Sequence, residues 1–428
     1  MEIALPILTL LFLLVLGLPV AVSLALAGAL GIFMLNGVDS VVGILATAPG
    51  SALGSYELLT IPMFVLMAEL MGLSGISSDL FRAVAVWTNR LKGGVGISTV
   101  ITGALFGAVS GSSTAAAATL AKTAIPSMLS QNYQPGRAAG ITAMAGTIAM
   151  LIPPSVALIF YGLLSGVNIS ALLIAGIVPG LLVTLVLSLV IRVTVRNDKL
   201  NSDSETNYSW ADRFKSLKVA VPFVALFGAV TGLIYTGVAT PVESSAIGAF
   251  AALVYTVLNR TCSWSGFKTA LINTCAVTAM IGLIIVCAQI FGYFVTMSRF
   301  AHDLASFVGA SDLPVWAFMA IIIVLYLVLG LFLDLISILI LTVPIMMPIV
   351  AQLGLDPIWF GIIVILLAEI GIVTPPVGMN VFVVSKISAI PLNDCFAGVV
   401  VPVIALLGLI IVLVIWPEIT LWLPSTMN

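Results

Sequence analysis

Two proline pairs inside long apolar stretches constrain this chain more than any other feature. Pro153-Pro154 recurs 222 residues later as Pro375-Pro376, and Pro126 matches Pro348 at the same offset. Since proline lacks an amide donor and clashes with the preceding helical turn, each pair forces an unwound segment in an otherwise helical stretch. The freed carbonyls then need a ligand, a water or an ion. Two such breaks in corresponding halves of a chain are typical of a transporter binding site.

The stretches around these prolines belong to a membrane protein. Of the 428 residues, 61% are hydrophobic and 7% are charged, against about 25% charged in a soluble chain. Apolar runs of about 17 to 25 residues recur from end to end, which predicts an all-α polytopic membrane protein. The first run follows Met1-Glu2 without a basic leader, so we expect no cleavable signal peptide. The four cysteines lack disulfide or metal-ligand spacing and are interpreted as apolar packing residues.

The apolar runs predict about five crossings in each half of the chain. A turn at Gly17-Leu18-Pro19 splits residues 5–35 into two of them. The other crossings of the first half are residues 55–73, 138–164 and 171–195. Those of the second half are residues 219–235, 241–258, 270–296, 358–384 and 396–416. The spans 138–164 and 358–384 carry the proline pairs.

Each half also contains an apolar segment that is interrupted near its middle. Residues 94–129 are broken by Ser-Gly-Ser-Ser-Thr at 110–114, and residues 314–351 are broken near Asp334. The arms of the first segment, about 16 residues each, are marginal as spans, which favours re-entrant hairpins. An odd number of crossings then inserts the halves in opposite orientations. We expect a first inverted repeat at 1–196, a cytoplasmic linker at 197–217 and a second inverted repeat at 218–428.

The basic residues predict the orientation. With the polar linker in the cytoplasm, thirteen of the fifteen Lys and Arg residues fall on the cytoplasmic side. Arg299 falls outside, and Lys122 lies in the first hairpin. Both termini then face outward, the first hairpin enters from the cytoplasm and the second enters from the outside.

The first hairpin tip suits an anion. Residues 110–114 combine hydroxyls with backbone N–H groups at a half-helix N-terminus, while the carbonyls that end the preceding arm suit a cation. The alternative is a packing seam of small residues, since alanines follow at 115–118. Around the first proline pair, Gly146, Thr147 and Ser155 offer oxygens or close approach, or simply accommodate the kink.

The second break is richer in oxygen ligands. Thr374 provides a hydroxyl, Asn380 an amide, and the flanking glycines let carbonyls converge on an alkali cation. Asp334 and Glu369 are carboxylates at membrane depth, where an unpaired charge is costly and a functional role is the first expectation. Helix capping or subunit packing is the alternative for both.

These considerations give two sets of candidate site residues. The candidate substrate-binding residues are Ser112, Ser113, Thr114, Ser155, Asn380 and Asp334. The candidate cation-binding residues are Ser110, Gly111, Ser112, Gly146, Thr147, Pro153, Gly330, Asp334, Gly371, Thr374, Gly378 and Met379. No catalytic residue is predicted.

The remaining polar residues have simpler interpretations. Glu243 completes a capping box with Thr240 and is expected to start a helix. Glu69 is open between a functional role and contact with a partner subunit. Lys122 snorkels to the cytoplasm or attracts a substrate anion. His302 is the only histidine, which excludes a zinc protease site.

At these residues the sequence resembles a known family, the large membrane (DctM-type) subunit of tripartite ATP-independent periplasmic (TRAP) transporters. The resemblance runs over the whole chain, through residues 16–21, 107–126, 152–155 and 374–380. It implies an elevator-like architecture of the ion-transporter superfamily, in which hairpins and broken spans carry substrate and Na⁺ across a fixed scaffold.

The resemblance also implies a function and partners. The chain would be a subunit of a secondary active transporter that imports an organic acid, of the C4-dicarboxylate or sialic acid class, with Na⁺ as coupling ion and no organic cofactor. A periplasmic binding protein (P-type) would deliver the substrate, and a small four-helix membrane subunit (Q-type) would complete the complex in the bacterial inner membrane. The chain carries no Gly-rich nucleotide loop, so we expect no ATP coupling, and no nucleic-acid partner.

Three alternatives remain beside this one. A stand-alone Na⁺- or H⁺-coupled anion carrier of the same architecture would need neither companion. An intramembrane protease is disfavoured, because no base histidine lies near the serines of the first tip and Asp334 has no paired aspartate in a protease motif. A channel is disfavoured because hairpins that enter from both sides favour alternating access over a continuous pore. We therefore expect a transporter and not an enzyme.

Overall fold

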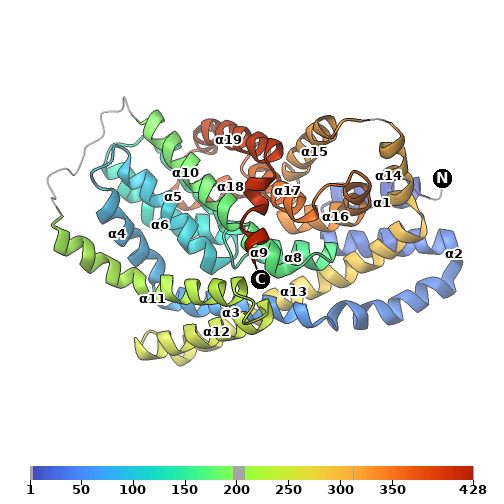
Figure 1. Cartoon of the computed structure of the whole chain (residues 1–428), viewed down its shortest axis with the longest axis horizontal. Coiled ribbons are helices and arrows are strands. Elements are labelled where there is room, and N and C mark those ends of the chain that lie inside the picture. Colours follow the sequence, from blue (N-terminus) through green and yellow to red (C-terminus); the bar gives the residue numbers. More distant parts are fainter. Residues whose placement is uncertain (1–2, 196–207, 312, 428) are drawn as a thin grey trace.

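The computed structural model describes residues 3–195, 208–311 and 313–427, and these residues form helices with no β-strand among them (Figure 1). Seven of the described helices are long and apolar enough to cross a membrane, or eight when the bent helix at 210–235 is included. The predicted all-α polytopic membrane fold is therefore confirmed.

The helices follow the order that the sequence predicts. The first half contains α1 (Ala4–Val15), α2 (Val20–Leu53), α3 (Thr60–Leu73), α4 (Ile76–Thr88), α5 (Gly94–Ser110), α6 (Ser113–Ser130), α7 (Pro135–Thr147), α8 (Val156–Ser165), α9 (Ile169–Ala175) and α10 (Ile177–Thr194). The second half contains α11 (Trp210–Tyr235), α12 (Pro241–Leu258), α13 (Trp264–Met297), α14 (Phe300–Ala310), α15 (Val315–Gly330), α16 (Leu335–Gln352), α17 (Pro357–Gly371), α18 (Met379–Ser388), α19 (Leu392–Ile415) and α20 (Glu418–Leu421).

Two helix boundaries differ from the prediction. The chain leaves the helical conformation at Gly37 (φ 78°, ψ −175°), close to the predicted end at residue 35, but a second helical segment that the sequence does not predict follows and completes α2 at Leu53. Helix α11 begins well before the predicted residue 219. Ser209 and Asp212 form a capping box there, which satisfies the first backbone N–H groups. Residues 197–207 of the predicted linker lie outside the described residues.

In Figure 1, α2, α3, α12 and α13 run along the lower part of the view together with α11, and we call α2, α3, α12 and α13 the lower helix layer. Helix α13, of 34 residues, and the kinked α2 make the most extensive helix contact among the described residues, followed by α3 with α12. The α2–α13 crossing is close because Gly28 has no side chain: a Cβ there would lie 2.8 Å from the Cα of Phe291. Small residues permit such backbone approach between membrane helices.

The hairpin and broken helices gather above this layer, and we call α5–α8 with α15–α19 the upper group. Its members interleave the two halves of the chain, since α6 contacts α18, α7 contacts α19 and α8 contacts α16. The α7–α19 contact is made through backbone, because a Cβ on Gly140 would lie 2.3 Å from the carbonyl carbon of Gly398. The upper group is therefore built from both halves at once.

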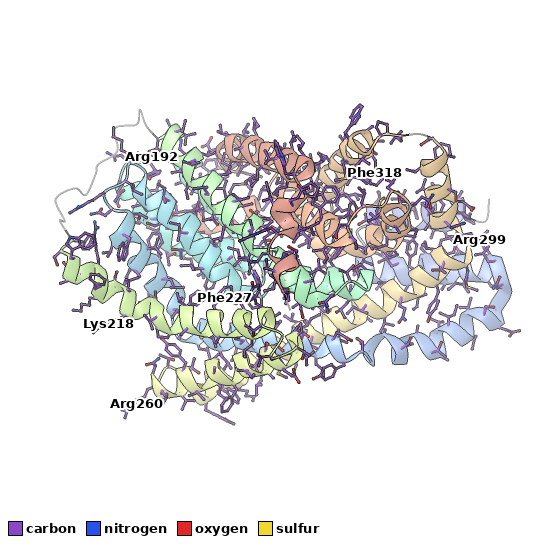
Figure 2. All side chains as sticks on the ribbon, in the orientation of Figure 1. Arg192, Lys218, Phe227, Arg260, Arg299 and Phe318 are labelled. Carbon is purple, nitrogen blue, oxygen red and sulfur yellow. The ribbon has the colours of Figure 1, made fainter. Side chains whose placement is uncertain are left out.

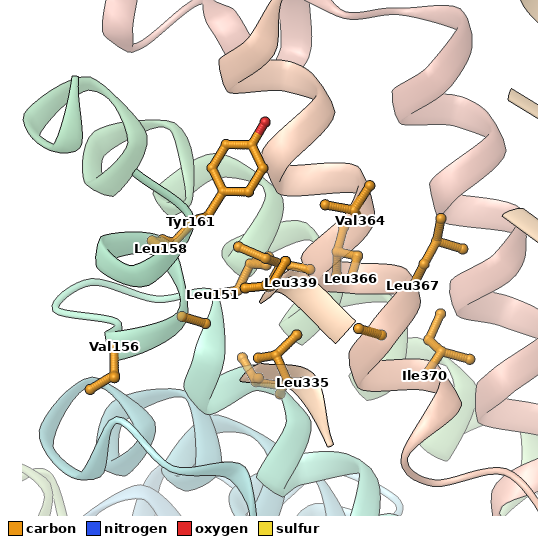
Figure 3. Close-up of a cluster of buried hydrophobic side chains, with 14 of the residues drawn as sticks. Leu151, Val156, Leu158, Tyr161, Leu335, Leu339, Val364, Leu366, Leu367 and Ile370 are labelled. Carbon is orange, nitrogen blue, oxygen red and sulfur yellow. The ribbon is translucent and has the colours of Figure 1, made fainter. Parts of the chain in front are cut away.

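A buried apolar cluster holds this group together where α8, α16 and α17 meet. Figure 3 shows Leu158 and Tyr161 of α8 close to Leu339 of α16 and Val364 of α17, and all four are 0% exposed. The Tyr161 hydroxyl donates a hydrogen bond of 2.7 Å to the carbonyl oxygen of Pro357 at the start of α17. A buried phenol hydroxyl without a hydrogen-bond partner would cost free energy, and this bond provides the partner while joining α8 to the second half of the chain.

The basic residues separate along the longest axis. Figure 2 places Arg192, Lys218 and Arg260 toward one end of the molecule and Arg299 at the other. Arg299 is the residue that the sequence separates from the cytoplasmic group. The side of the membrane on which each end lies stays a prediction.

Candidate substrate and cation site

The two predicted hairpin tips have matching local structure. Helix α5 ends at Ser110 and α6 begins at Ser113, while α15 ends at Gly330 and α16 begins at Leu335. The side chain of Ser110 lies outside the described part of the chain.

Ser112 and Asp334, which are 222 residues apart, are the N-cap residues of α6 and α16. Each accepts a hydrogen bond of 3.3 Å from a backbone N–H three residues on, from Ala115 and Ser337 respectively. The Ser337 hydroxyl also donates to the Asp334 carboxylate. Each second hairpin arm therefore begins with a capped helix N-terminus, where unpaired N–H groups and the helix dipole favour an anion.

The first proline break is enclosed. After α7 the chain makes a 3₁₀ turn and passes through Pro153 and Pro154, both buried. Ser155, which is 0% exposed, caps α8 by accepting from the Leu158 N–H at 3.3 Å and donates to the Met150 carbonyl. Its hydroxyl is therefore largely committed to the backbone.

The second proline break is open. Residues 375–377 are exposed, in contrast to the equivalent part of the first break. The Thr374 hydroxyl donates to the Gly371 carbonyl at 2.7 Å, and the backbone N–H of Asn380 donates to the Ile372 carbonyl at 3.4 Å. Since a hydroxyl keeps its lone pairs when it donates, the Thr374 and Gly371 oxygens form a pair of neutral acceptors beside the break. Gly378, with φ of 57°, starts α18 in the left-handed region.

Each hairpin contacts the broken helix of its own half through backbone. A Cβ on Gly107 of α5 would lie 2.2 Å from the Cα of Ala149, and one on Gly330 of α15 would lie 2.6 Å from the Cα of Gly371. Backbone groups of tip and break are thus brought together without side chains between them. The same device recurs at Gly146, where a Cβ would lie 2.7 Å from the Ser113 carbonyl oxygen.

Most of the other candidate residues lie at the hairpin tips and proline breaks, and they differ in how much of each residue is exposed. Gly111, Ser113 and Thr147 are buried, while Ser112, Thr114 and Met379 are half-buried. Asp334 is exposed at the second tip and accepts a hydrogen bond from the Ser337 hydroxyl, so it acts locally as a helix cap. Among the described residues, no group of three His, Cys, Asp or Glu side chains gathers as a metal cluster.

Two polar side chains nearby lack hydrogen bonds. Glu369 of α17 is 2% exposed and Asn380 of α18 is 0% exposed. Within the described part of the chain, neither carboxyl oxygen and neither amide atom makes a hydrogen bond of normal geometry. The Ser113 side chain is nevertheless close enough to Glu369 to interact with its carboxyl. The sequence marks Glu369 as a carboxylate at depth, but its proximity to the first hairpin tip comes only from the structure.

Four other titratable residues lie outside the tips and breaks, and two of them are hydrogen-bonded to neighbouring residues. Glu243 caps α12 in a capping box with Thr240, as predicted. Glu69 of α3 accepts a hydrogen bond of 3.1 Å from the Asn273 amide of α13, a partner 204 residues away that no sequence pattern reveals. Lys122 and His302 are exposed.

A cavity of about 1010 Å³ separates the lower helix layer from part of the upper group. Its walls come from the end of α2, the α8–α9 loop, the start of α12, the C-terminal part of α13 and the second arm of the second hairpin, α16. Polar lining includes Ser51 and Gln289, whose side chains lie 3.3 Å apart. Sequence reasoning missed this cavity because its walls are distant in the chain. None of the predicted tip or break residues lines it.

Comparison with known proteins identifies the family. The model of the DctM component of the tripartite ATP-independent periplasmic transporter matches residues 7–419. The chain is 34% identical over 404 residues to the C4-dicarboxylate TRAP transporter large permease protein of Pseudomonas aeruginosa, covering 94% of each chain. It is 32% identical over 411 residues to the sialic acid TRAP transporter large permease protein of Vibrio cholerae, covering 96% of this chain and 95% of the relative.

Two further comparisons agree with this. The 2,3-diketo-L-gulonate TRAP transporter large permease protein of Escherichia coli is 31% identical over 404 residues and is covered to 94% in both chains. The crystal structure of the YdaH transporter of Alcanivorax borkumensis has the same fold, with a TM-score of 0.67 and 17% identity over 96% of this chain and 98% of that one. The relatives are transporter permease subunits and not enzymes. This membrane-embedded, multi-pass chain therefore belongs to the DctM family, the large permease subunits of TRAP transporters.

Proposed function

We propose that this subunit imports an organic acid by Na⁺-coupled secondary active transport. The observation that carries the proposal is the pairing of each hairpin with a helical break through backbone, at Gly107 with Ala149 and at Gly330 with Gly371. The pairing sets capped helix N-termini, suited to an anion, beside unwound carbonyls, suited to a cation. Relatives named for C4-dicarboxylate, sialic acid and 2,3-diketo-L-gulonate support a carboxylate as the substrate class.

The substrate carboxylate is received at the hairpin tips by neutral donors. Ser112, Ser113 and Thr114 offer hydroxyls and backbone N–H groups at the first tip, with Ser155, Asn380 and Asp334 contributing around it. Neutral donors hold an anion without the strength of an arginine clamp, which suits release by a carrier. The coupling cations are held at the breaks, and the Thr374 and Gly371 oxygens, joined by a hydrogen bond of 2.7 Å, support such a site in the second half.

The transport cycle is an elevator within two inverted repeats. Residues 1–196 and 218–428 form the repeats, and residues 197–217 join them in the cytoplasm. In support, α6 and α16 begin 222 residues apart, as do α7 and α17. The upper group moves against the lower helix layer, and the cavity of about 1010 Å³ between them provides room for displacement.

Two partner proteins complete the transporter in the bacterial inner membrane, where both termini of this chain face the periplasm. A periplasmic binding protein delivers the acid and a small Q-type membrane subunit supports the scaffold. An isethionate TRAP transporter permease named DctMQ, from Oleidesulfovibrio alaskensis, supports the second partner. It is 32% identical over 406 residues, and this chain covers 62% of its length. The rival function is a stand-alone Na⁺- or H⁺-coupled anion carrier.

Uptake into proteoliposomes tests both functions. The protein is reconstituted alone, with the small subunit, and with the small subunit plus the binding protein, each under an inward Na⁺ gradient. We expect uptake of a radiolabelled dicarboxylate or sialic acid only in the complete mixture. Uptake that persists when choline replaces Na⁺ contradicts Na⁺ coupling. Uptake by this subunit alone favours the stand-alone carrier.

A further inference from the structure

We propose that Glu369, Asn380 and Ser113 form an additional Na⁺ site, which must be filled before the anionic substrate binds at the first hairpin tip. The inference rests on the proposed function, because it assigns an occupant and an order of binding to the same region. It adds a site to the two that the helical breaks predict.

The first observation is a buried carboxylate without a counter-charge. Glu369 is 2% exposed, and among the described residues no Lys, Arg or His pairs with it and no hydrogen bond of normal geometry reaches it. Only the Ser113 hydroxyl, on a side chain that is also 2% exposed, is close enough to interact. Because an uncompensated buried carboxylate is strongly unfavourable, the position calls for a neutralising partner, either a proton or a bound cation, and the oxygen ligands described next favour the cation.

The second observation is an unused amide in the segment that follows α17. Asn380 is 0% exposed and neither of its amide atoms is bonded. Its backbone N–H donates to the carbonyl of Ile372, which lies one helical turn after Glu369 on the same face of α17. Helix α18, which begins at Met379, also packs against α6, whose first residue is Ser113.

These three side chains supply oxygens of the right kind. The carboxylate lies near the end of α17, the amide at the start of α18 and the hydroxyl at the start of α6, and α18 packs against α6. Hard cations prefer oxygen donors of these types, and a single negative charge suits a monovalent ion. The structure thus provides both the ligands and the electrostatic need for Na⁺.

This site is separate from the cation site proposed at the second break. Gly371 faces the second hairpin, where its Cα meets Gly330. Glu369 stands two residues earlier, about 200° around a helix of 3.6 residues per turn, and so faces the first hairpin. The residue 222 positions earlier is Thr147, which is uncharged and whose hydroxyl donates to the Met144 carbonyl at 2.8 Å. The site is therefore a feature of the second half alone.

Its position gives it a role in coupling. The proposed anion site at the first tip includes Ser113, the residue that Glu369 contacts. A substrate carboxylate and an ionised Glu369 would repel each other across a buried, weakly screened distance. Na⁺ at Glu369 removes that repulsion, so the acid binds tightly only after the cation. Such reciprocal affinity is what ties substrate movement to the ion gradient.

The test counts bound Na⁺ in the purified, assembled transporter without substrate. Equilibrium binding of ²²Na⁺ is measured for wild type, Glu369→Gln and the control Glu69→Gln, which makes the same chemical change at a half-buried carboxyl already bonded to Asn273. We expect Glu369→Gln to bind one Na⁺ fewer than wild type and the control to bind the full number. An unchanged count in Glu369→Gln overturns the site, and it is also the result expected if a proton occupies Glu369.

A second variant guards against misfolding of the first. Asn380→Leu keeps the buried volume but removes the amide oxygen, and we expect it to weaken one Na⁺ site by about tenfold. Unchanged Na⁺ affinity in this variant also counts against the site. The two proposals fail differently. Wild-type uptake that needs no Na⁺ contradicts the proposed function, whereas Na⁺-driven wild-type uptake with an unaltered count in Glu369→Gln contradicts only this inference.

Discussion

Substituting Gly371 by alanine tests whether backbone contact between hairpin and break matters for the cation site. A Cβ at Gly371 would lie 2.5 Å from the Cα of Gly330 and 3.0 Å from its carbonyl carbon, and ordinary contact begins at 3.4 Å. The two segments must therefore separate by about 0.9 Å (3.4 minus 2.5). Both clashing atoms belong to the backbone, so no side chain can rotate away.

The change in folding stability caused by Gly371→Ala follows from two opposing contributions. Overpacking of this kind costs about 1–3 kcal/mol, while alanine in place of glycine in a helix gains about 0.5–1 kcal/mol. The two terms span a net destabilisation of about 0–2.5 kcal/mol, and we expect the central value of about 1 kcal/mol. The separation of about 0.9 Å also exceeds the spread of hard-cation–oxygen distances, about 2.3–2.6 Å for Ca²⁺. The Gly371→Ala variant should therefore lose stabilisation by Na⁺, which reaches about 2.7 kcal/mol at a hundredfold excess over Kd.

Thermal unfolding of the detergent-solubilised protein, in NaCl and in choline chloride, measures both effects. The control is Gly408→Ala in α19, where a Cβ meets nothing within 4 Å. We expect the control to keep the wild-type rise of Tm with Na⁺, and Gly371→Ala to unfold a few degrees lower with a reduced rise. If Gly371→Ala keeps both the wild-type Tm and its response to Na⁺, the packing argument is refuted.

Three further predictions address the ligands and the topology. Thr374→Val keeps the side-chain shape but removes an oxygen, so we expect a higher Na⁺ concentration for half-maximal uptake; an unchanged Na⁺ dependence removes Thr374 from the site. Ser112→Ala should weaken uptake more than Lys122→Gln in correctly assembled complexes if neutral donors hold the substrate, as proposed, and the reverse ranking would make Lys122 the counter-ion. Cysteines introduced by Gln131→Cys and Gln352→Cys should react with an impermeant maleimide from the cytoplasm and from the outside respectively; labelling of both from one side contradicts opposite insertion of the halves.

The sequence predicts local features of this fold well. The helix α12 has the predicted bounds, Pro241–Leu258, because a capping box and a proline at its first position act within one turn. The hairpin tips and proline breaks also lie where they are predicted, since proline and glycine act on the backbone near them.

Contacts between segments that are distant in the chain could not be predicted from the sequence. The proximity of Glu369 to Ser113, and the hydrogen bond from Asn273 to Glu69, join residues more than 200 positions apart. Such pairs depend on how the helices pack, and no periodicity encodes them. The helical segment between Gly37 and Leu53 was also missed, although the break at Gly37 lies close to the predicted end of the helix.

The backbone contact of α7 with α19 limits how the molecule can be divided. Gly136 and Gly140 of the first half meet Gly398 of the second with no space for a methyl group. Two helices joined in this way slide past each other only if the contact is broken, so α7 and α19 belong to the same rigid unit. In the proposed elevator, the boundary between moving and stationary parts would therefore run across each half of the sequence. Two half-chains made separately would each lack one side of this helix contact.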